Sequence, residues 1–170
     1  MKTIKFFAIA ALFLGFSVSA MAQTNPTVSA TAYAGARIIT PLSIENTDAQ
    51  SLEFGNIVAS LAGGTVTVAP GATTATYAGV AAPAGLAGTI RSAKFTVTGD
   101  GSSTYSVLIA QETALTSGSN TMNLSDFTNN SNKVLEEGTE TFEVGATLNV
   151  GAEQAAGTYL GSFKVTVAYE

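Results

Sequence analysis

The chain has 170 residues, of which twelve are acidic and seven basic, and it contains no Cys, no His and no Trp. Without a thiolate or an imidazole, Ser–His–Asp and Cys–His catalysis and Cys-based metal sites are excluded. The acidic balance argues against nucleic acid as a partner, because nucleic-acid binding depends on clustered Lys and Arg side chains that neutralise phosphates.

The first 22 residues show the three parts of a cleavable export signal in the right order. Lys2 and Lys5 form a positive start, Phe6 to Phe16 form an uncharged apolar stretch, and Ala20-Met21-Ala22 supplies the small residues for cleavage. The apolar stretch is about 11 residues, whereas a membrane-spanning helix needs ~20, so a membrane anchor is the weaker alternative. We therefore predict an exported protein that begins near Gln23 and is located in the periplasm, at the cell surface or outside the cell.

Removal of these 22 residues leaves 148, with five basic and twelve acidic residues and a net charge of −7. This length fits one domain that buries ~68–70% of the surface exposed by its unfolded chain. The domain must hold together without disulfides, because it has no Cys. The one dense acidic patch is expected to be a set of solvated turns or strand faces; it consists of Glu136, Glu137, Glu140 and Glu143.

The start of the mature chain alternates between apolar and polar residues, which is the pattern of a strand with one apolar face. The candidate residues for an assembly strand are Val28, Ala30, Ala32, Ala34, Ala36 and Ile38. The same parity continues to Ile44, which would give a strand about three times the usual length, and Pro41 predicts a break. We therefore predict an alternating arm at residues 23–40, which either folds back or reaches another molecule, and a domain at residues 41–170.

The domain itself contains many short alternating runs and no apolar spacing that predicts a helix. Residues 142–150 and 163–169 surround a turn and are predicted to form a hairpin, and residues 95–97 and 105–109 are predicted to form a second one. Short strands at such regular intervals predict an all-β fold, an antiparallel β-sandwich. The predicted structural core consists of Leu52, Phe54, Phe95, Val97, Tyr105, Val107, Phe142, Val144, Leu148, Phe163, Val165 and Val167.

The remaining chemistry-bearing residues do not combine into a catalytic or metal-binding pattern. Glycoside hydrolysis needs two carboxylates ~5–9.5 Å apart in a cleft, whereas the acidic residues here lie mostly in turn-like segments. Asp100-Gly101-Ser102 lacks the further ligands of a calcium loop and is better explained as a turn. We predict a non-enzymatic protein that needs no cofactor and no metal.

Seven motifs, taken together and in order, resemble a bacterial secreted family described as domain of unknown function four-four-zero-two. They are Pro41-Leu42-Ser43-Ile44, Leu52-Glu53-Phe54-Gly55-Asn56-Ile57, Gly64-Thr65-Val66-Thr67-Val68, Phe95-Thr96-Val97-Thr98-Gly99, Met122-Asn123-Leu124 with Asp126-Phe127, Val144 to Gly151, and Gly157 to Phe163. That family is distantly similar to spore-coat-U-type and chaperone–usher pilin domains. The resemblance implies an immunoglobulin-like, pilin-like sandwich that is completed by a neighbour's N-terminal strand. The chain departs from many pilins because it lacks their disulfide, and because its arm carries mostly Ala on the apolar face.

Two functions remain open at this point. The first is a secreted or cell-surface structural or adhesion-type subunit that assembles by β-strand addition through the arm. Its partners are expected to be copies of itself or related subunits, with a periplasmic chaperone as a further partner, and the protein is not integral to a membrane. The alternative is a self-contained monomeric module that binds a carbohydrate or another surface ligand on loops at residues 81–88 and 116–133.

Overall fold

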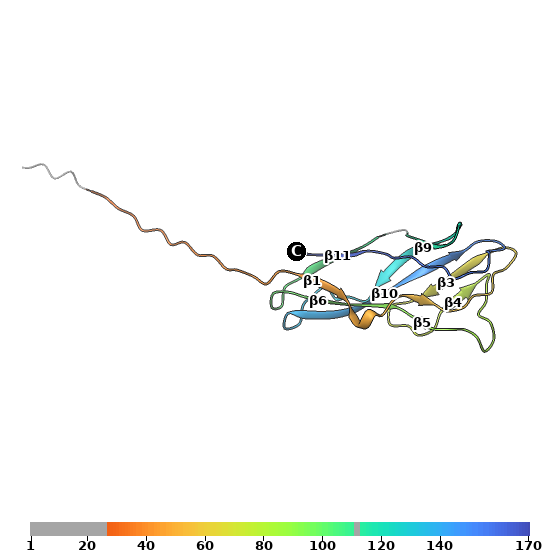
Figure 1. Ribbon diagram of the computed structural model, residues 1–170. Helices are drawn as coiled ribbons and strands as arrows, with labels where there is room; N and C mark the ends of the chain where they lie inside the picture. Colours follow the sequence, from red (N-terminus) through yellow and green to blue (C-terminus); the bar gives the residue numbers. More distant parts are fainter. Residues whose placement is uncertain (1–26, 111–112) are drawn as a thin grey trace, which may run out of the picture. The chain divides into compact units, whose positions relative to one another are not determined.

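The computed structural model of the chain describes residues 27–110 and 113–170 (Figure 1). The predicted signal peptide and the first residues of the arm lie outside the described residues. The chain divides into two units, one that ends at Ala36 and a second that comprises Arg37–Glu170. In neither described range is there a helix with the length and apolar character that a membrane span requires.

Antiparallel strands dominate the described part of the second unit. Many of them coincide with the alternating apolar and polar runs in the sequence. In chain order the elements are β1 (Ser43–Asn46), the 3₁₀ turn η1 (Thr47–Ala49), β2 (Glu53–Phe54), β3 (Gly64–Val68), β4 (Thr76–Ala78), β5 (Ile90–Arg91), β6 (Ala93–Thr98), β7 (Tyr105–Ile109), β8 (Thr113–Ser117), β9 (Asn120–Asn129), β10 (Thr139–Val150) and β11 (Val165–Tyr169). The predicted all-β class is therefore confirmed, since the described residues contain strands and one 3₁₀ turn but no α-helix.

Strand β10 is the centre of the largest sheet, as Figure 1 shows. It pairs with β6 through its first half, with β3 through its second half, and with β9 along its opposite edge. Strands β1 and β4 extend this sheet beyond β6 and β3, and β8 extends it beyond β9. Two further pairs, β11 with β7 and β2 with β5, complete a curled arrangement that is consistent with a β-sandwich.

The core is built around β10, whose apolar side chains at alternate positions face the interior. Phe142, Val144, Ala146, Leu148 and Val150 are all buried, as their alternation predicts. The core has two clusters, one around Phe54 and Leu148 and the other around Tyr105 and Phe142. Every predicted core residue lies in one of the two clusters: fully buried are Phe54, Val97, Tyr105, Phe142, Val144 and Leu148, and half-buried are Leu52, Phe95, Val107, Phe163, Val165 and Val167.

Both predicted hairpins are wrong, because successive strands cross to different sheets instead of pairing with each other. β10 does not pair with β11, and β6 does not pair with β7; β11 and β7 pair together instead. Turn residues at 99–102 and 151–157 therefore mark crossings between layers, which is common in sandwich folds. The predicted loop at residues 116–133 is also wrong, because β8 and β9 form a hairpin there around Gly118, at φ 60°.

Candidate functional site

Two edge strands of the second unit, β1 and β11, face each other without pairing. Within the described ranges, β1 has a ladder only with β6, and β11 has a ladder only with β7. The two edges meet at the Tyr169 hydroxyl, which donates to the Thr40 carbonyl oxygen and accepts from the Asp100 amide, both at 2.6 Å. A side chain at Gly99 would collide with this hydroxyl, so the contact requires Gly at that position. We call this point of contact the closed end.

Away from the closed end the edges separate around an apolar cavity of about 270 Å³. One wall comes from the end of β1 and from β2, and the opposite wall comes from the segment that precedes β11. Phe95 and Phe163 form part of the lining, and their rings are in edge-to-face contact with centroids 6.1 Å apart. The full lining is Asn46, Ser51, Leu52, Phe54, Ala93, Phe95, Leu115, Leu124, Gly161, Ser162 and Phe163.

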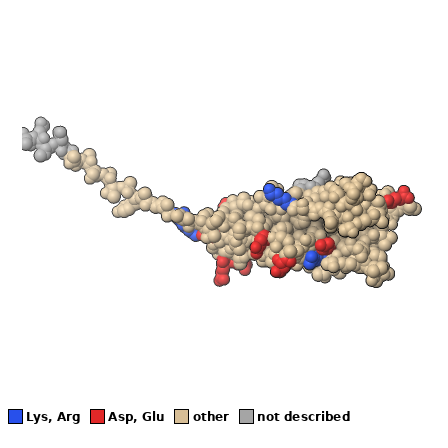
Figure 2. Space-filling model, viewed as in Figure 1, with Lys and Arg blue, Asp and Glu red and all other residues tan. Residues whose placement is uncertain are grey.

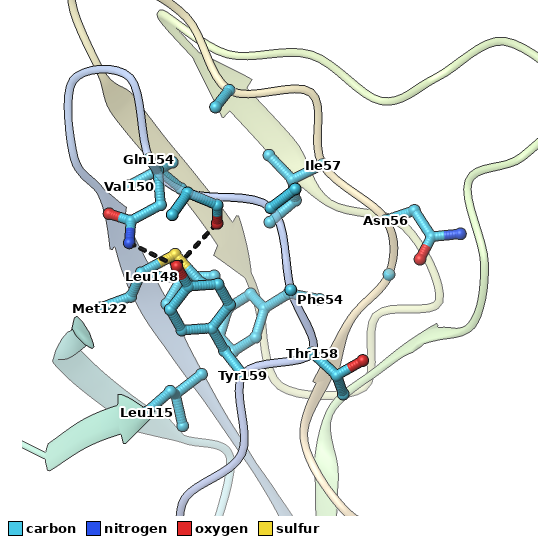
Figure 3. A pocket seen from close by; sticks show the side chains of 15 residues that line it. Phe54, Asn56, Ile57, Leu115, Met122, Leu148, Val150, Gln154, Thr158 and Tyr159 are labelled. Atoms are coloured by element: carbon cyan, nitrogen blue, oxygen red, sulfur yellow. Dashed lines mark hydrogen bonds between the residues drawn. The ribbon is translucent and has the colours of Figure 1, made fainter. Parts of the chain in front are cut away.

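A second cavity, of about 360 Å³, lies farther along the same two walls (Figure 3). It shares Phe54 and Leu115 with the first cavity. Figure 3 shows the Tyr159 ring beside Met122, with its hydroxyl accepting from the Gln154 side-chain amide (2.8 Å) and donating to the Ala155 carbonyl (2.7 Å). The full lining is Phe54, Gly55, Asn56, Ile57, Ala59, Leu115, Met122, Leu148, Val150, Gln154, Ala155, Ala156, Gly157, Thr158 and Tyr159.

We refer to these two cavities together as the edge groove, bounded by residues 46–59 on one side and 154–163 on the other. Among the described residues, neither lining includes a charged side chain. Charged side chains are also sparse on the face of the molecule that Figure 2 shows. The floor consists of core side chains that remain half-exposed, such as Leu52, Leu115, Met122 and Phe163. The edge groove therefore has an apolar, partly exposed floor beside the ends of β1 and β2.

The residues predicted to form an assembly strand lie in an exposed segment that belongs to no ladder within the described chain. Residues 27–41 contain no strand pairing, and Val28, Tyr33 and Ile38 are 94%, 98% and 97% exposed. The six candidate residues Val28, Ala30, Ala32, Ala34, Ala36 and Ile38 therefore make no sheet within the described chain. Arg37, the first residue of the second unit, forms an ion pair of 2.5 Å with Asp100 of the same unit.

The predicted acidic patch separates into two exposed and two hydrogen-bonded carboxylates. Glu136 and Glu137 are exposed, as expected. Glu140 instead accepts from the Tyr105 hydroxyl at 2.5 Å and from the Asn132 amide at 2.7 Å. Burial, and then the hydrogen bond to Glu140, raises the pKa of Tyr105 to about 12.

Glu143, the fourth member of the patch, is also bound within the fold. It accepts hydrogen bonds from the buried Ser92 hydroxyl and from the Gly71 amide, which lies 3.1 Å away. Both carboxylates therefore hold neighbouring segments in place instead of presenting a free acid. Among the described residues, no group of three or more Asp, Glu, His or Cys side chains is arranged to hold a metal ion.

The described strands define an all-β, antiparallel domain that is consistent with a β-sandwich and has an uncharged groove along one side. The chain belongs to the family described as Domain of unknown function (DUF4402), whose model matches residues 42–169. The match confirms the family resemblance seen in the sequence motifs, and it covers β1 to β11 but not the arm. Comparisons with curated proteins and with solved structures found no match. Similarity to spore-coat-U-type and pilin domains remains a prediction.

Proposed function

We propose that this chain is a non-enzymatic, secreted or cell-surface structural or adhesion-type subunit that assembles by β-strand addition through its N-terminal arm. One observation carries the proposal: within the described residues, an alternating, exposed arm has no ladder partner, and the β1 and β11 edges of the attached domain each have only one. Free strand edges are templates for pairing with another chain. Backbone hydrogen bonds then supply affinity, and alternate side chains supply the register.

The composition of the arm supports this role. Residues 27–36 carry no charge, so they enter an apolar site without the cost of desolvating an ion. Their apolar parity also agrees with a strand that buries one face and exposes the other. Copies of the same chain are the proposed partners, with related subunits and a periplasmic chaperone as further candidates.

The parity of the arm provides the test. Two double variants of the chain from Gln23 to Glu170 carry the same added charge on opposite faces: Ala32→Asp with Ala34→Asp, and Ser29→Asp with Thr31→Asp. Mass is measured by light scattering after size exclusion over a hundredfold range of concentration. We expect oligomers for the unmodified chain and for the Ser29/Thr31 variant, and monomers for the Ala32/Ala34 variant.

Two results would contradict the proposal. One is an unmodified chain that remains monomeric at the highest concentration, and the other is equal assembly by both double variants. A stable monomer that binds members of a glycan array would favour the alternative function, a self-contained binding module. The hairpin of β8 and β9 already replaces one of the two loops that were expected to display such a ligand site.

A further inference from the structure

We infer that Asp100-Gly101 is a site of spontaneous covalent modification, at which the aspartate converts to isoaspartate, and that the ion pair from Arg37 restrains this reaction. The inference goes beyond the proposed function and does not depend on it. Both reacting groups lie in the turn that follows β6, next to the closed end. The sequence contains no other Asp-Gly pair and no Asn-Gly pair.

The reaction joins a backbone nitrogen to the side chain that precedes it. The Gly101 nitrogen attacks the carboxyl carbon of Asp100 and forms a C–N bond. One carboxyl oxygen leaves as water, which takes the amide proton and a second proton from solvent, and a five-membered succinimide ring results. Water then adds to one of the two ring carbonyls and breaks one C–N bond. This step gives either aspartate again or isoaspartate, and it regains the water and the proton, so no other reactant is required.

The attacking nitrogen is accessible in this turn. Gly101 has no side chain that could hinder its own nitrogen, and even an added Cβ would meet no atom within 4 Å. The turn is held by a bond from the Ser103 amide to the Asp100 carbonyl and by one from the Gly138 amide to the Gly101 carbonyl. Within the described ranges, the Gly101 amide itself donates to no acceptor, so no hydrogen bond has to break before the nitrogen reacts.

The carboxyl group of Asp100, in contrast, is held in place. Its Oδ2 accepts a charge-assisted bond of 2.5 Å from the Arg37 guanidinium. To react, the carboxyl carbon has to turn toward Gly101 and release an oxygen, and the ion pair opposes both changes. The Asp100 side chain is 17% exposed and that of Arg37 is 76% exposed. Arg37 is therefore a restraint that can be substituted without disturbing the core.

The two other aspartates of the chain lack this arrangement. Asp48 precedes Ala49, and Asp126 precedes Phe127. In both cases the following residue carries a side chain that hinders its own nitrogen, and the Phe127 ring is the larger obstacle. Asp126 thus provides an internal control within the same molecule.

Conversion to isoaspartate would alter the closed end. The main chain at residue 100 becomes one carbon longer, and the carbonyl that accepts from the Ser103 amide moves onto the former side chain. The free carboxylate moves onto Cα, one carbon farther from Arg37. The same Cα carries the amide that donates to the Tyr169 hydroxyl. We therefore expect isoaspartate to weaken this turn and to accumulate with the age of the folded protein.

Peptide mapping after incubation in water enriched in heavy oxygen measures the reaction, because opening of the ring adds one heavy oxygen atom. The chain from Gln23 to Glu170 is kept folded at neutral pH and is then digested in ordinary water. Trypsin cleaves after Lys94 and Lys133, so one peptide contains both Asp100 and Asp126. Electron-transfer fragmentation distinguishes aspartate from isoaspartate at each position.

Three variants test the role of the ion pair. Arg37→Gln removes it, Arg37→Lys keeps a cation at the same position, and Lys164→Gln removes the same charge from another exposed side chain. We expect isoaspartate at Asp100 to accumulate severalfold faster in Arg37→Gln than in the unmodified chain, the Lys164→Gln chain or the Arg37→Lys chain. Asp126 should remain aspartate in all of them. In urea, where the fold and its ion pair are lost, all the chains should react at the same rate.

Three results would overturn the inference. Equal rates for the folded Arg37→Gln and unmodified chains would contradict the restraint by Arg37. Isoaspartate at Asp126 as abundant as at Asp100 would contradict the assignment of the site. A difference between variants that persists in urea would show that the folded ion pair is not its cause. These measurements are made at a concentration where the chain is monomeric, so they leave the proposed assembly untouched.

Discussion

The Tyr169 hydroxyl forms the hydrogen bonds that hold the closed end together, and Tyr169→Phe removes this hydroxyl with almost no change in side-chain volume. The substitution deletes the bond to the Thr40 carbonyl and the bond from the Asp100 amide. The first of these holds the chain just before β1, and the second holds the turn after β6. We therefore expect this end of the domain to loosen while the rest of the fold is retained.

The loss in stability follows from two neutral hydrogen bonds. Each contributes about 0.5–1.5 kcal/mol net, and water can partly replace the lost partner because Tyr169 is only half-buried. We expect the free energy of unfolding to fall by about 1–2 kcal/mol. At a urea slope of about 2 kcal/mol per M, in the middle of the typical range, the midpoint moves down by roughly 0.5–1 M with no change of slope.

Urea unfolding followed by circular dichroism, at a concentration where the chain is monomeric, measures this change. Amide hydrogen exchange adds a local readout, because the Asp100 amide loses its acceptor and should exchange faster. Tyr33→Phe is the matched control, since that side chain is 98% exposed in the arm. An unchanged midpoint together with unchanged exchange at Asp100 would refute the role given to the hydroxyl.

Four further substitutions have expected outcomes in the same unfolding assay. Leu148→Ala, at a position only 2% exposed, should cost about 2–5 kcal/mol, whereas Leu160→Ala, at 70% exposed, should cost under about 0.5. Because folding raises the pKa of Tyr105 from 10.0 to about 12, stability should be constant below pH 10 and fall as pH rises toward 12; Tyr105→Phe should remove that slope. Ser92→Ala should cost about 1–3 kcal/mol, because it leaves Glu143 without its buried donor.

The alternation of side chains predicted much of the core because the burial of one strand face is a local property. In β10 every second residue from Phe142 to Val150 is buried, so the pattern alone identified the central strand. The same reasoning predicts an arm, whose parity continues toward β1 across Pro41. For β10, the identity of the strand and its buried face were therefore predictable from the sequence.

Strand pairing was not predictable from the same patterns, because partners are chosen by tertiary packing. The turn at residues 99–102 has the composition of a hairpin turn, yet its Asp100 amide is bonded to Tyr169, a residue on a third strand. That bond stabilises a turn at which the chain crosses between layers. Asp100 and Tyr169 are 69 residues apart in the sequence, so only the folded chain brings them together. The hairpin of β8 and β9 was missed for a different reason. Exposed polar residues such as Asn123 give this stretch a loop-like composition, although Met122 and Leu124 face inward.

The groove was invisible in the sequence for a similar reason. Its lining comes from six separate segments, and the half-buried Leu115, Met122 and Phe163 look like ordinary core residues in the sequence. The one local signal was the run Gly157 to Phe163, in which small residues alternate irregularly with aromatic ones. Gly157 and Gly161 lie against β8, where a side chain at either position would collide with Ser117 or with Ala114 and Leu115.

Charged side chains are distributed unevenly along the two exposed strand edges, and charge on an edge strand disfavours pairing with other chains. Lys164 and Glu170 flank β11 and Glu45 is exposed on β1, so these stretches carry the charges that commonly protect strand edges. Residues 155–163 carry none, which leaves the open stretch free for a strand that fits it. If the arm pairs with another strand as proposed, a slip of one residue would turn Arg37 toward an apolar floor and the Ala stripe toward water, which disfavours the slipped register.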